Sequence, residues 1–155
     1  MRMNWLLAGL TSVALVWSAS AFPQVTSQLA IQIVNQRPAD AAACGFSETA
    51  ATATAARTLG NNRIAVVGKS FPALRISASP VTISTRECAI TLTVQVVGET
   101  ALRQPAGGFT SRKGWAAIVF CERQYIHSGP QAGMDGYVTT ALEQTIKQCL
   151  DELDY

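Results

Sequence analysis

The stretch FCERQYIHSG, residues 120–129, brings together side chains that could carry out acid–base or nucleophilic chemistry. It contains a cysteine, an acid, an arginine and the single histidine of this 155-residue chain. A cysteine–histidine nucleophile needs a free thiol, and a glutamate–histidine pair needs both side chains on one face. Successive side chains of an extended strand alternate between faces, so Glu122 and His127 fall on opposite faces. We interpret the stretch as a strand with Cys121 buried in it, not as an active site.

The rest of the chain contains few of the patterns that carry catalysis. A single histidine excludes a two-histidine metal site, and no G-x-S-x-G, H-E-x-x-H or phosphate-binding P-loop motif is present. Glu87, Glu99 and Glu122 could supply two carboxylates for glycoside cleavage, but no motif singles them out. We therefore predict no catalytic residue, no cofactor and no metal site, with a small hydrolase as the alternative.

The cysteines indicate disulfide bonds. Cys44, Cys88, Cys121 and Cys149 are dozens of residues apart, whereas zinc ligands usually come in pairs about two to four residues apart. Two disulfides are the expected use in an exported protein, and four cysteines allow three pairings. The predicted pairing is Cys121–Cys149 with Cys44–Cys88, because each bridge would then connect a helical segment to a strand. A Cys88–Cys121 bridge between neighbouring strands is the main alternative.

The amino terminus has the pattern of a cleaved export signal. Arg2 precedes an apolar run over residues 5–17, and the small residues 18–21 follow it. A membrane-spanning helix needs about 20 apolar residues, and this run is shorter. We expect cleavage between Ala21 and Phe22, so that residues 1–21 are the signal peptide and residues 22–155 form a single domain. The expected location is the periplasm or the secreted space, with no transmembrane anchor in the mature chain.

Hydrophobic patterning then indicates the elements of the mature chain. Strand patterns are found over residues 25–34, 63–67, 73–83, 88–97 and 115–127. Pro72 and Pro80 mark the third of these as an edge or bulged strand. Ser47 is expected to cap an alanine-rich helix that ends at Gly60, and apolar residues three or four apart predict a helix over 134–153. Together they predict an α+β fold: a mostly antiparallel sheet of four to five strands, two helices packed on one face, and two disulfides.

The segment between the last two strands, residues 99–114, is the most suggestive of binding. Loops beyond about 12–15 residues without their own structure are usually functional or disordered. Basic and aromatic side chains on such a loop suit a protein or an anionic polymer. The predicted partner-binding residues are Arg103, Phe109, Arg112, Lys113 and Trp115. The alternative is a plain hairpin connection whose charges keep it solvated.

Charge is balanced overall but unevenly placed. Removal of Arg2 with the signal leaves 11 of the 12 basic residues against 10 acids, which argues against nucleic acid as a partner. Residues 57–123 contain nine bases and three acids, a net of +6, whereas residues 134–155 contain one base and five acids, a net of −4. This asymmetry could form a cationic face for an anionic partner. A basic sheet neutralised by an acidic helix is the alternative interpretation.

Three classes of function follow from these observations. The expected one is a non-catalytic binding or adaptor protein of the periplasm or secreted space, whose partner is a protein or an anionic envelope polymer. A secreted inhibitor or immunity-type protein and a small hydrolase are the alternatives. The order of the elements is similar to that of small α/β domains in periplasmic assembly proteins, but no motif accompanies the similarity and it assigns no residue a role.

Overall fold

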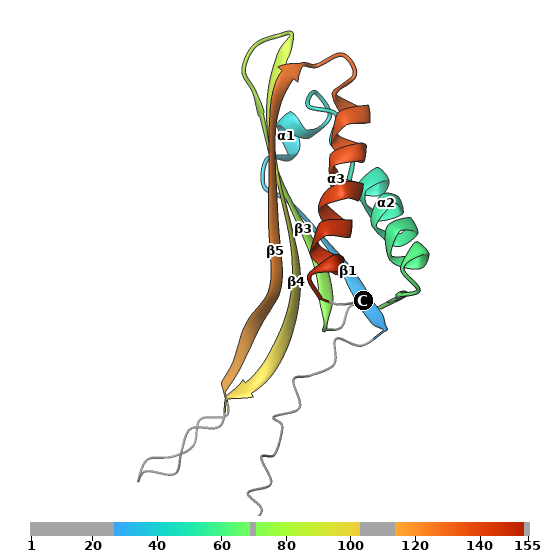
Figure 1. Ribbon diagram of the computed structural model, residues 1–155. Helices are drawn as coiled ribbons and strands as arrows, with labels where there is room; N and C mark the ends of the chain where they lie inside the picture. The colour runs from blue at the N-terminus through green and yellow to red at the C-terminus, as the bar shows by residue number, and fades with distance from the viewer. Residues whose placement is uncertain (1–26, 69–70, 103–113, 154–155) are drawn as a thin grey trace, which may run out of the picture.

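The computed structural model describes residues 27–68, 71–102 and 114–153 (Figure 1), so the predicted signal peptide lies outside the described residues. Three helices and five strands make up the described part of the chain. In chain order they are β1 (Gln28–Asn35), α1 (Pro38–Ala41), α2 (Glu48–Asn61), β2 (Ala65–Val67), β3 (Ala73–Thr82), β4 (Glu87–Leu102), β5 (Gly114–Pro130) and α3 (Met134–Asp151).

The strands form one five-stranded sheet in the order β2-β1-β3-β4-β5. β1 runs parallel to both of its neighbours, and β3, β4 and β5 pair antiparallel. The parallel pair β1–β2 is joined through α2, because parallel strands need a crossover connection. Both long helices, α2 and α3, lie on the same face of the sheet (Figure 1). The predicted α+β fold, with two helices on one face, is confirmed.

The prediction that residues 73–83 form an edge or bulged strand is wrong. β3 is the central strand, with β1 on one side and β4 on the other. Its pairing with β1 ends at Ala78, whereas Pro80 pairs only with Ile90 of β4. Proline lacks the N–H that a ladder on both sides would use. Pro80 is tolerated because it lies beyond the end of β1.

The helices begin and end close to where the sequence predicts. The Ser47 hydroxyl accepts a hydrogen bond from the Ala50 N–H at 3.3 Å, which caps α2 as expected. The small buried residues Ala51 and Ala55 allow α2 to lie close to its neighbours. In α3 the buried residues follow the predicted helical spacing: Met134, Val138, Ala141, Leu142, Thr145, Ile146, Cys149 and Leu150. The single turn α1 has no counterpart among the predicted elements.

The main core fills the space between the sheet and the two long helices. Its largest fully buried side chains are contributed by β1, β3, β4, α2 and α3: Leu29, Leu59, Leu74, Ile76, Ile90, Leu92, Met134, Leu142, Ile146 and Leu150. Complete burial of such a side chain is worth about 1.5–3 kcal/mol. A second, smaller cluster of Ala30, Ala73 and Val97, with Val67 and Phe71 packed against it, lies on the opposite face. The centre of that outer face along β4 is polar, with half-buried Thr91, Thr93 and Gln95, and Val34 and Ile126 are exposed apolar side chains on the same face.

Two disulfides connect the helical layer to the sheet. Cys44, between α1 and α2, is bonded to Cys88 at the start of β4, with a Cα–Cα distance of 5.4 Å. Cys121 of β5 is bonded to Cys149 of α3, with a Cα–Cα distance of 5.6 Å. The predicted pairing is confirmed, and the alternative Cys88–Cys121 bridge is wrong. The reason is the register of β4 and β5: Cys88 lies opposite Gly129, eight residues or about 26 Å along the strand from Cys121.

Candidate partner-binding hairpin

The stretch FCERQYIHSG lies within β5, as predicted, and its polar groups are dispersed. The Glu122 carboxylate is on the outer face, where it accepts a hydrogen bond from the Gln95 side-chain amide. The His127 ring is on the helix-facing side and stacks on Tyr137 of α3, with ring centroids 5.1 Å apart. Tyr125 also stacks against His127, with ring centroids 6.1 Å apart. The acid and the histidine therefore lie on opposite faces and form no catalytic pair.

The three carboxylates considered for glycoside cleavage are also far apart. Glu87 and Glu99 lie on β4, twelve residues or about 40 Å apart along an extended strand. Glu122 lies opposite Gln95, four residues or about 13 Å from Glu99 along the strand direction. Paired carboxylates of glycosidases lie about 5–9.5 Å apart. No two of these acids are placed for that reaction.

The described residues contain no metal cluster, and the cavity between the two long helices is small. Within residues 27–68, 71–102 and 114–153, no group of three or more histidine, cysteine or acidic side chains is close enough to hold a metal ion. The cavity between α2 and α3, lined by residues such as Ala51, Val138 and Leu142, has a volume of about 10 Å³. Small-molecule sites usually measure about 300–1,000 Å³. This cavity has room for about one water molecule.

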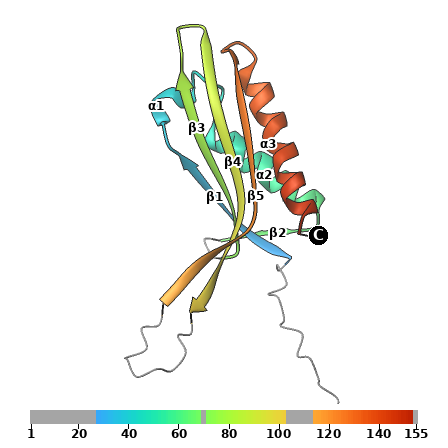
Figure 2. The same ribbon diagram turned by 60° about the vertical axis from the view of Figure 1, so that its left-hand side comes forward.

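The feature that stands out is a projecting pair of strands. β4 pairs with β3 only as far as Val97, whereas its pairing with β5 continues to Leu102 opposite Gly114. Residues 98–102 and 114–118 therefore form a two-stranded segment, beside which the described residues place no third strand, and we call it the β4–β5 ribbon. It extends beyond the rest of the sheet and beyond the helices (Figures 1 and 2). The predicted loop over 99–114 is thus too long: strand pairing continues on both sides, leaving 103–113 between the strands.

A β-bulge marks the base of the ribbon. Val96 pairs with Cys121 and Val97 with Val119, so that Phe120 is an extra residue in β5. Its ring lies against Gly98, where a Cβ atom would come within 2.6 Å of the Phe120 Cε2 atom. Bulges bend a strand and increase its local twist. The ribbon turns away from the sheet at this point, as Figure 2 shows.

The predicted binding residues are divided between the ribbon and the segment that it carries. Arg103, Phe109, Arg112 and Lys113 lie outside the described residues. The backbone of Trp115 belongs to β5 and pairs with Ala101 in the ribbon. Because Leu102 and Gly114 are direct partners, segment 103–113 begins and ends at the far end of the ribbon. Its length and glycines indicated a loop, but no sequence signal indicated the ribbon beneath it.

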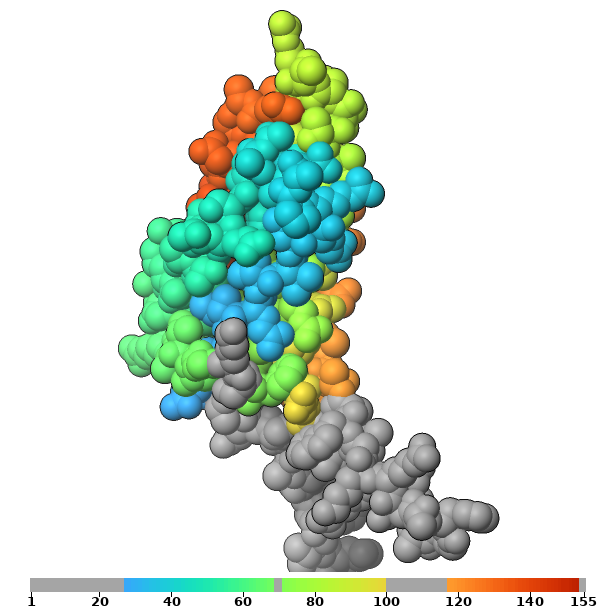
Figure 3. Space-filling model, turned by 180° about the vertical axis from the view of Figure 1, so that it is seen from behind, coloured from blue at the N-terminus to red at the C-terminus, as the bar shows by residue number. Residues whose placement is uncertain are grey.

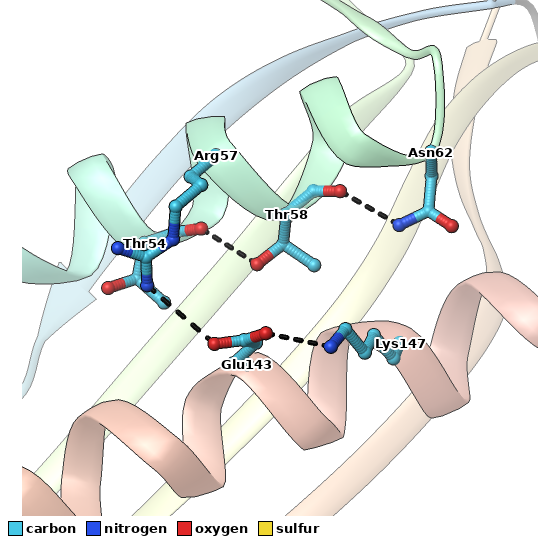
Figure 4. A network of polar contacts seen from close by, with 6 residues as sticks. All are labelled: Thr54, Arg57, Thr58, Asn62, Glu143 and Lys147. Carbon is cyan, nitrogen blue, oxygen red and sulfur yellow. Dashed lines mark hydrogen bonds and ion pairs between the residues drawn. The ribbon is translucent and has the colours of Figure 1, made fainter.

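Charged groups of α3 interact with bases from other elements. Glu143 lies between Lys147 of the same helix, at 2.7 Å, and Arg57 of α2, at 3.6 Å (Figure 4). The hydrogen bond from Lys147, the charge of Lys147 and then the charge of Arg57 hold the pKa of Glu143 below its usual value. Glu152 at the end of α3 forms an ion pair with Arg123 of β5. Part of the acidic charge of α3 is thus neutralised by basic residues of α2 and β5.

The fold and this hairpin define a class: a small two-layer α+β domain with disulfides between its layers and a projecting ribbon. No protein-family model matches the chain, and no curated protein matches it. A solved structure, the rare lipoprotein B from Shewanella oneidensis, is similar at 14% sequence identity over 81% of this chain and 93% of that chain, with a TM-score of 0.39.

Two further observations concern location. The two disulfides are compatible with an extracytoplasmic compartment, where oxidised cysteines persist. Among the helices of the described residues, none is both long enough and apolar enough to cross a membrane.

Proposed function

We propose that this chain is an exported, non-catalytic binding or adaptor protein that contacts its partner with segment 103–113 at the end of the β4–β5 ribbon. The observation that carries the proposal is the ribbon itself. β4 and β5 continue past β3, and no other strand in the described part of the chain pairs with them there. The backbone groups of the ribbon are therefore held away from the body, where another molecule can reach them from several sides.

The charge of segment 103–113 supports an anionic partner. The segment RQPAGGFTSRK contains three bases and no acid. Arginine guanidinium groups bind carboxylates and phosphates through two parallel hydrogen bonds. Phe109 adds an apolar side chain in the middle of the segment. An acidic protein surface or an anionic envelope polymer has the matching chemistry.

An exported location is part of the proposal, with cleavage after Ala21 and residence in the periplasm or secreted space. The amino-terminal pattern of a positive residue, an apolar run and small residues supports it. The two disulfides support it independently, because cytosolic proteins rarely keep such bonds. Intact-mass measurement of the exported protein tests the cleavage site, and a first residue other than Phe22 would contradict it.

The binding proposal is tested by capturing partners from native envelope material with the mature, oxidised protein. A variant in which Arg103, Arg112 and Lys113 are all changed to alanine should lose the captured partner, because the positive charge of the segment is removed. The matched control changes Arg37, Arg63 and Arg86 to alanine, which removes the same charge from exposed positions on the body. The control should keep the partner, and both variants should keep the thermal midpoint of the original protein.

Two results would overturn this assignment. Unchanged capture by the segment variant would show that the partner binds elsewhere, and equal loss in both variants would show a dependence on net charge alone. If the captured partner is an enzyme that loses its activity in the complex, the inhibitor alternative replaces the adaptor.

A further inference from the structure

The two edges of the sheet differ greatly in length. One edge is β2, with three residues, on the side of the molecule built from the N-terminal segments, which are blue to green in Figure 3. The other edge is β5, with 17 residues, which no further strand covers among the described residues. The edge-facing N–H and C=O groups of such a strand are a template for pairing with another strand. β5 is therefore a surface that can add a strand.

Only part of β5 is regular enough to serve as this template. The bulge at Phe120 interrupts it at one end, and the strand ends at Pro130. Between them, residues 122–130 pair with β4 without a register shift. Ile126 is in the middle of this stretch, on the outer face, and is 68% exposed. Residues 124–129 contain no lysine, arginine, acid or proline, the residues that usually protect an edge from pairing.

We propose that β5 pairs antiparallel with β5 of a second copy of the chain, about a two-fold axis that passes through Ile126. An isologous interface requires a surface that is complementary to itself, and the stretch 122–130 has this property. The register pairs Glu122 with Pro130 of the partner subunit, Arg123 with Gly129 of the partner subunit, Gln124 with Ser128 of the partner subunit, Tyr125 with His127 of the partner subunit, and Ile126 with Ile126 of the partner subunit.

The side chains favour this register over its nearest alternative. No two like charges face each other, and the two exposed isoleucines cover one another at the axis. On the helix-facing side, each His127 stacks with Tyr125 and Tyr137 of its own chain and gains an aromatic neighbour from the partner. Moving the axis to Gln124 would instead place each Glu122 carboxylate opposite an isoleucine. Aromatic and apolar cross-strand pairs stabilise a sheet, whereas such a mismatch does not.

The inference does not rest on the proposed function, because the edge stretch and segment 103–113 are separated by the bulge. The two-fold axis would lie perpendicular to the sheet, so both α3 helices would be on the same face of a continuous sheet across two chains. The strands of the two β5 edges run in opposite directions, so the two ribbons would project at opposite ends.

Sedimentation analysis of the mature, oxidised protein from about 1 µM to about 1 mM tests the dimer. The protein should be dimeric in this range. Ile126→Lys and Ile126→Glu should each raise the dimer dissociation constant by roughly tenfold or more, because like charges then meet at the axis. An equimolar mixture of the two variants should restore dimers, since lysine then faces glutamate.

The matched controls are Val34→Lys and Val34→Glu, on β1 and 42% exposed. They should leave the dissociation constant unchanged. Ile126→Thr keeps a β-branched side chain and provides a variant without added charge if either charged variant fails to fold; it should weaken the dimer less. A monomer throughout the concentration range, equal affinity in all Ile126 variants, or no recovery in the mixture would each overturn the proposal.

Discussion

At the residue scale, Gly98 and Phe120 determine where the ribbon leaves the sheet. Phe120 is the extra residue of the bulge, and its ring packs against the edge of the main core. It occupies the space that a side chain at position 98 would need. Glycine is disfavoured in strands, but at position 98 it leaves the space that the Phe120 ring fills.

We therefore predict opposite effects of Gly98→Ala in two backgrounds. In the otherwise unchanged protein it should lower the free energy of unfolding by about 1–3 kcal/mol, because the added methyl group displaces the Phe120 ring. In a Phe120→Ala background it should raise the free energy of unfolding by about 0.5–1 kcal/mol, because alanine loses less backbone entropy than glycine. Urea unfolding of the four proteins of this cycle gives the coupling. An identical effect in both backgrounds would contradict the contact.

At the element scale, α3 is held to the rest of the domain by three kinds of contact. Its buried stripe packs on the sheet, Cys149 is bonded to Cys121 of β5, and its acids interact with bases of α2 and β5. Burial and the disulfide carry most of the stability, because exposed ion pairs contribute about 0–1 kcal/mol each.

Removal of either disulfide should be costly. The Cys121–Cys149 bridge closes a loop of 28 residues and the Cys44–Cys88 bridge a loop of 44 residues. Changing both cysteines of a bridge to alanine removes that cross-link. Each should lower the free energy of unfolding by about 2–5 kcal/mol, the longer closure slightly more, because the unfolded chain gains freedom. Urea unfolding measures both values. Peptide mapping of the unreduced protein is the control, and a fragment joining Cys88 to Cys121 would refute the pairing.

The ion-pair network of Glu143 predicts a small pH dependence. Its pKa is lowered in the folded protein, so its contribution to stability is present above the usual glutamate pKa and is lost as the pH falls through the folded value. Glu143→Gln should therefore slightly lower the free energy of unfolding near pH 7, and the difference should shrink as the pH falls below the usual glutamate pKa and the carboxylate becomes protonated. Glu87→Gln, at an exposed acid without an ion pair to any described residue, is the control. A difference that persists in acid would assign the effect to packing.

The elements differ in how well the sequence predicts them. α3 and the cap of α2 follow from local signals: helical spacing, and a serine before an alanine-rich run. The disulfides follow from the expectation that each helical segment faces the sheet. The central position of β3 in the sheet is not predictable from the sequence. Pro80 indicates an edge strand unless it is known that β1 ends before it. The ribbon is not predictable from the sequence either. Residues 98–102 lack the alternation of apolar and polar side chains that a half-buried strand shows, and only their pairing with β5 makes them a strand.

At the scale of the whole molecule, β5 contributes to both proposed surfaces. The ribbon is at one end of this strand and the regular edge stretch at the other, with the bulge between them. From Gly114 to Ile126 the strand extends about 40 Å, so a dimer about Ile126 would place its two ribbon ends up to about 80 Å apart. Two such ends could hold separate partners, or separate sites of one polymer, at the same time.

The two disulfides also determine how the molecule bears mechanical load. The strands of the ribbon continue into the body as β4 and β5, and each is cross-linked there: β4 through Cys88 and β5 through Cys121. Tension applied to the end of the ribbon by a bound partner therefore travels along either strand to a covalent bond. The cross-link on β5 lies directly at the bulge, and the one on β4 lies at the far end of that strand. If tension broke the hydrogen bonds between β4 and β5, both strands would still be covalently attached to the helical layer. The Cys121–Cys149 bridge holds β5 to α3, and the Cys44–Cys88 bridge holds β4 to the turn that precedes α2.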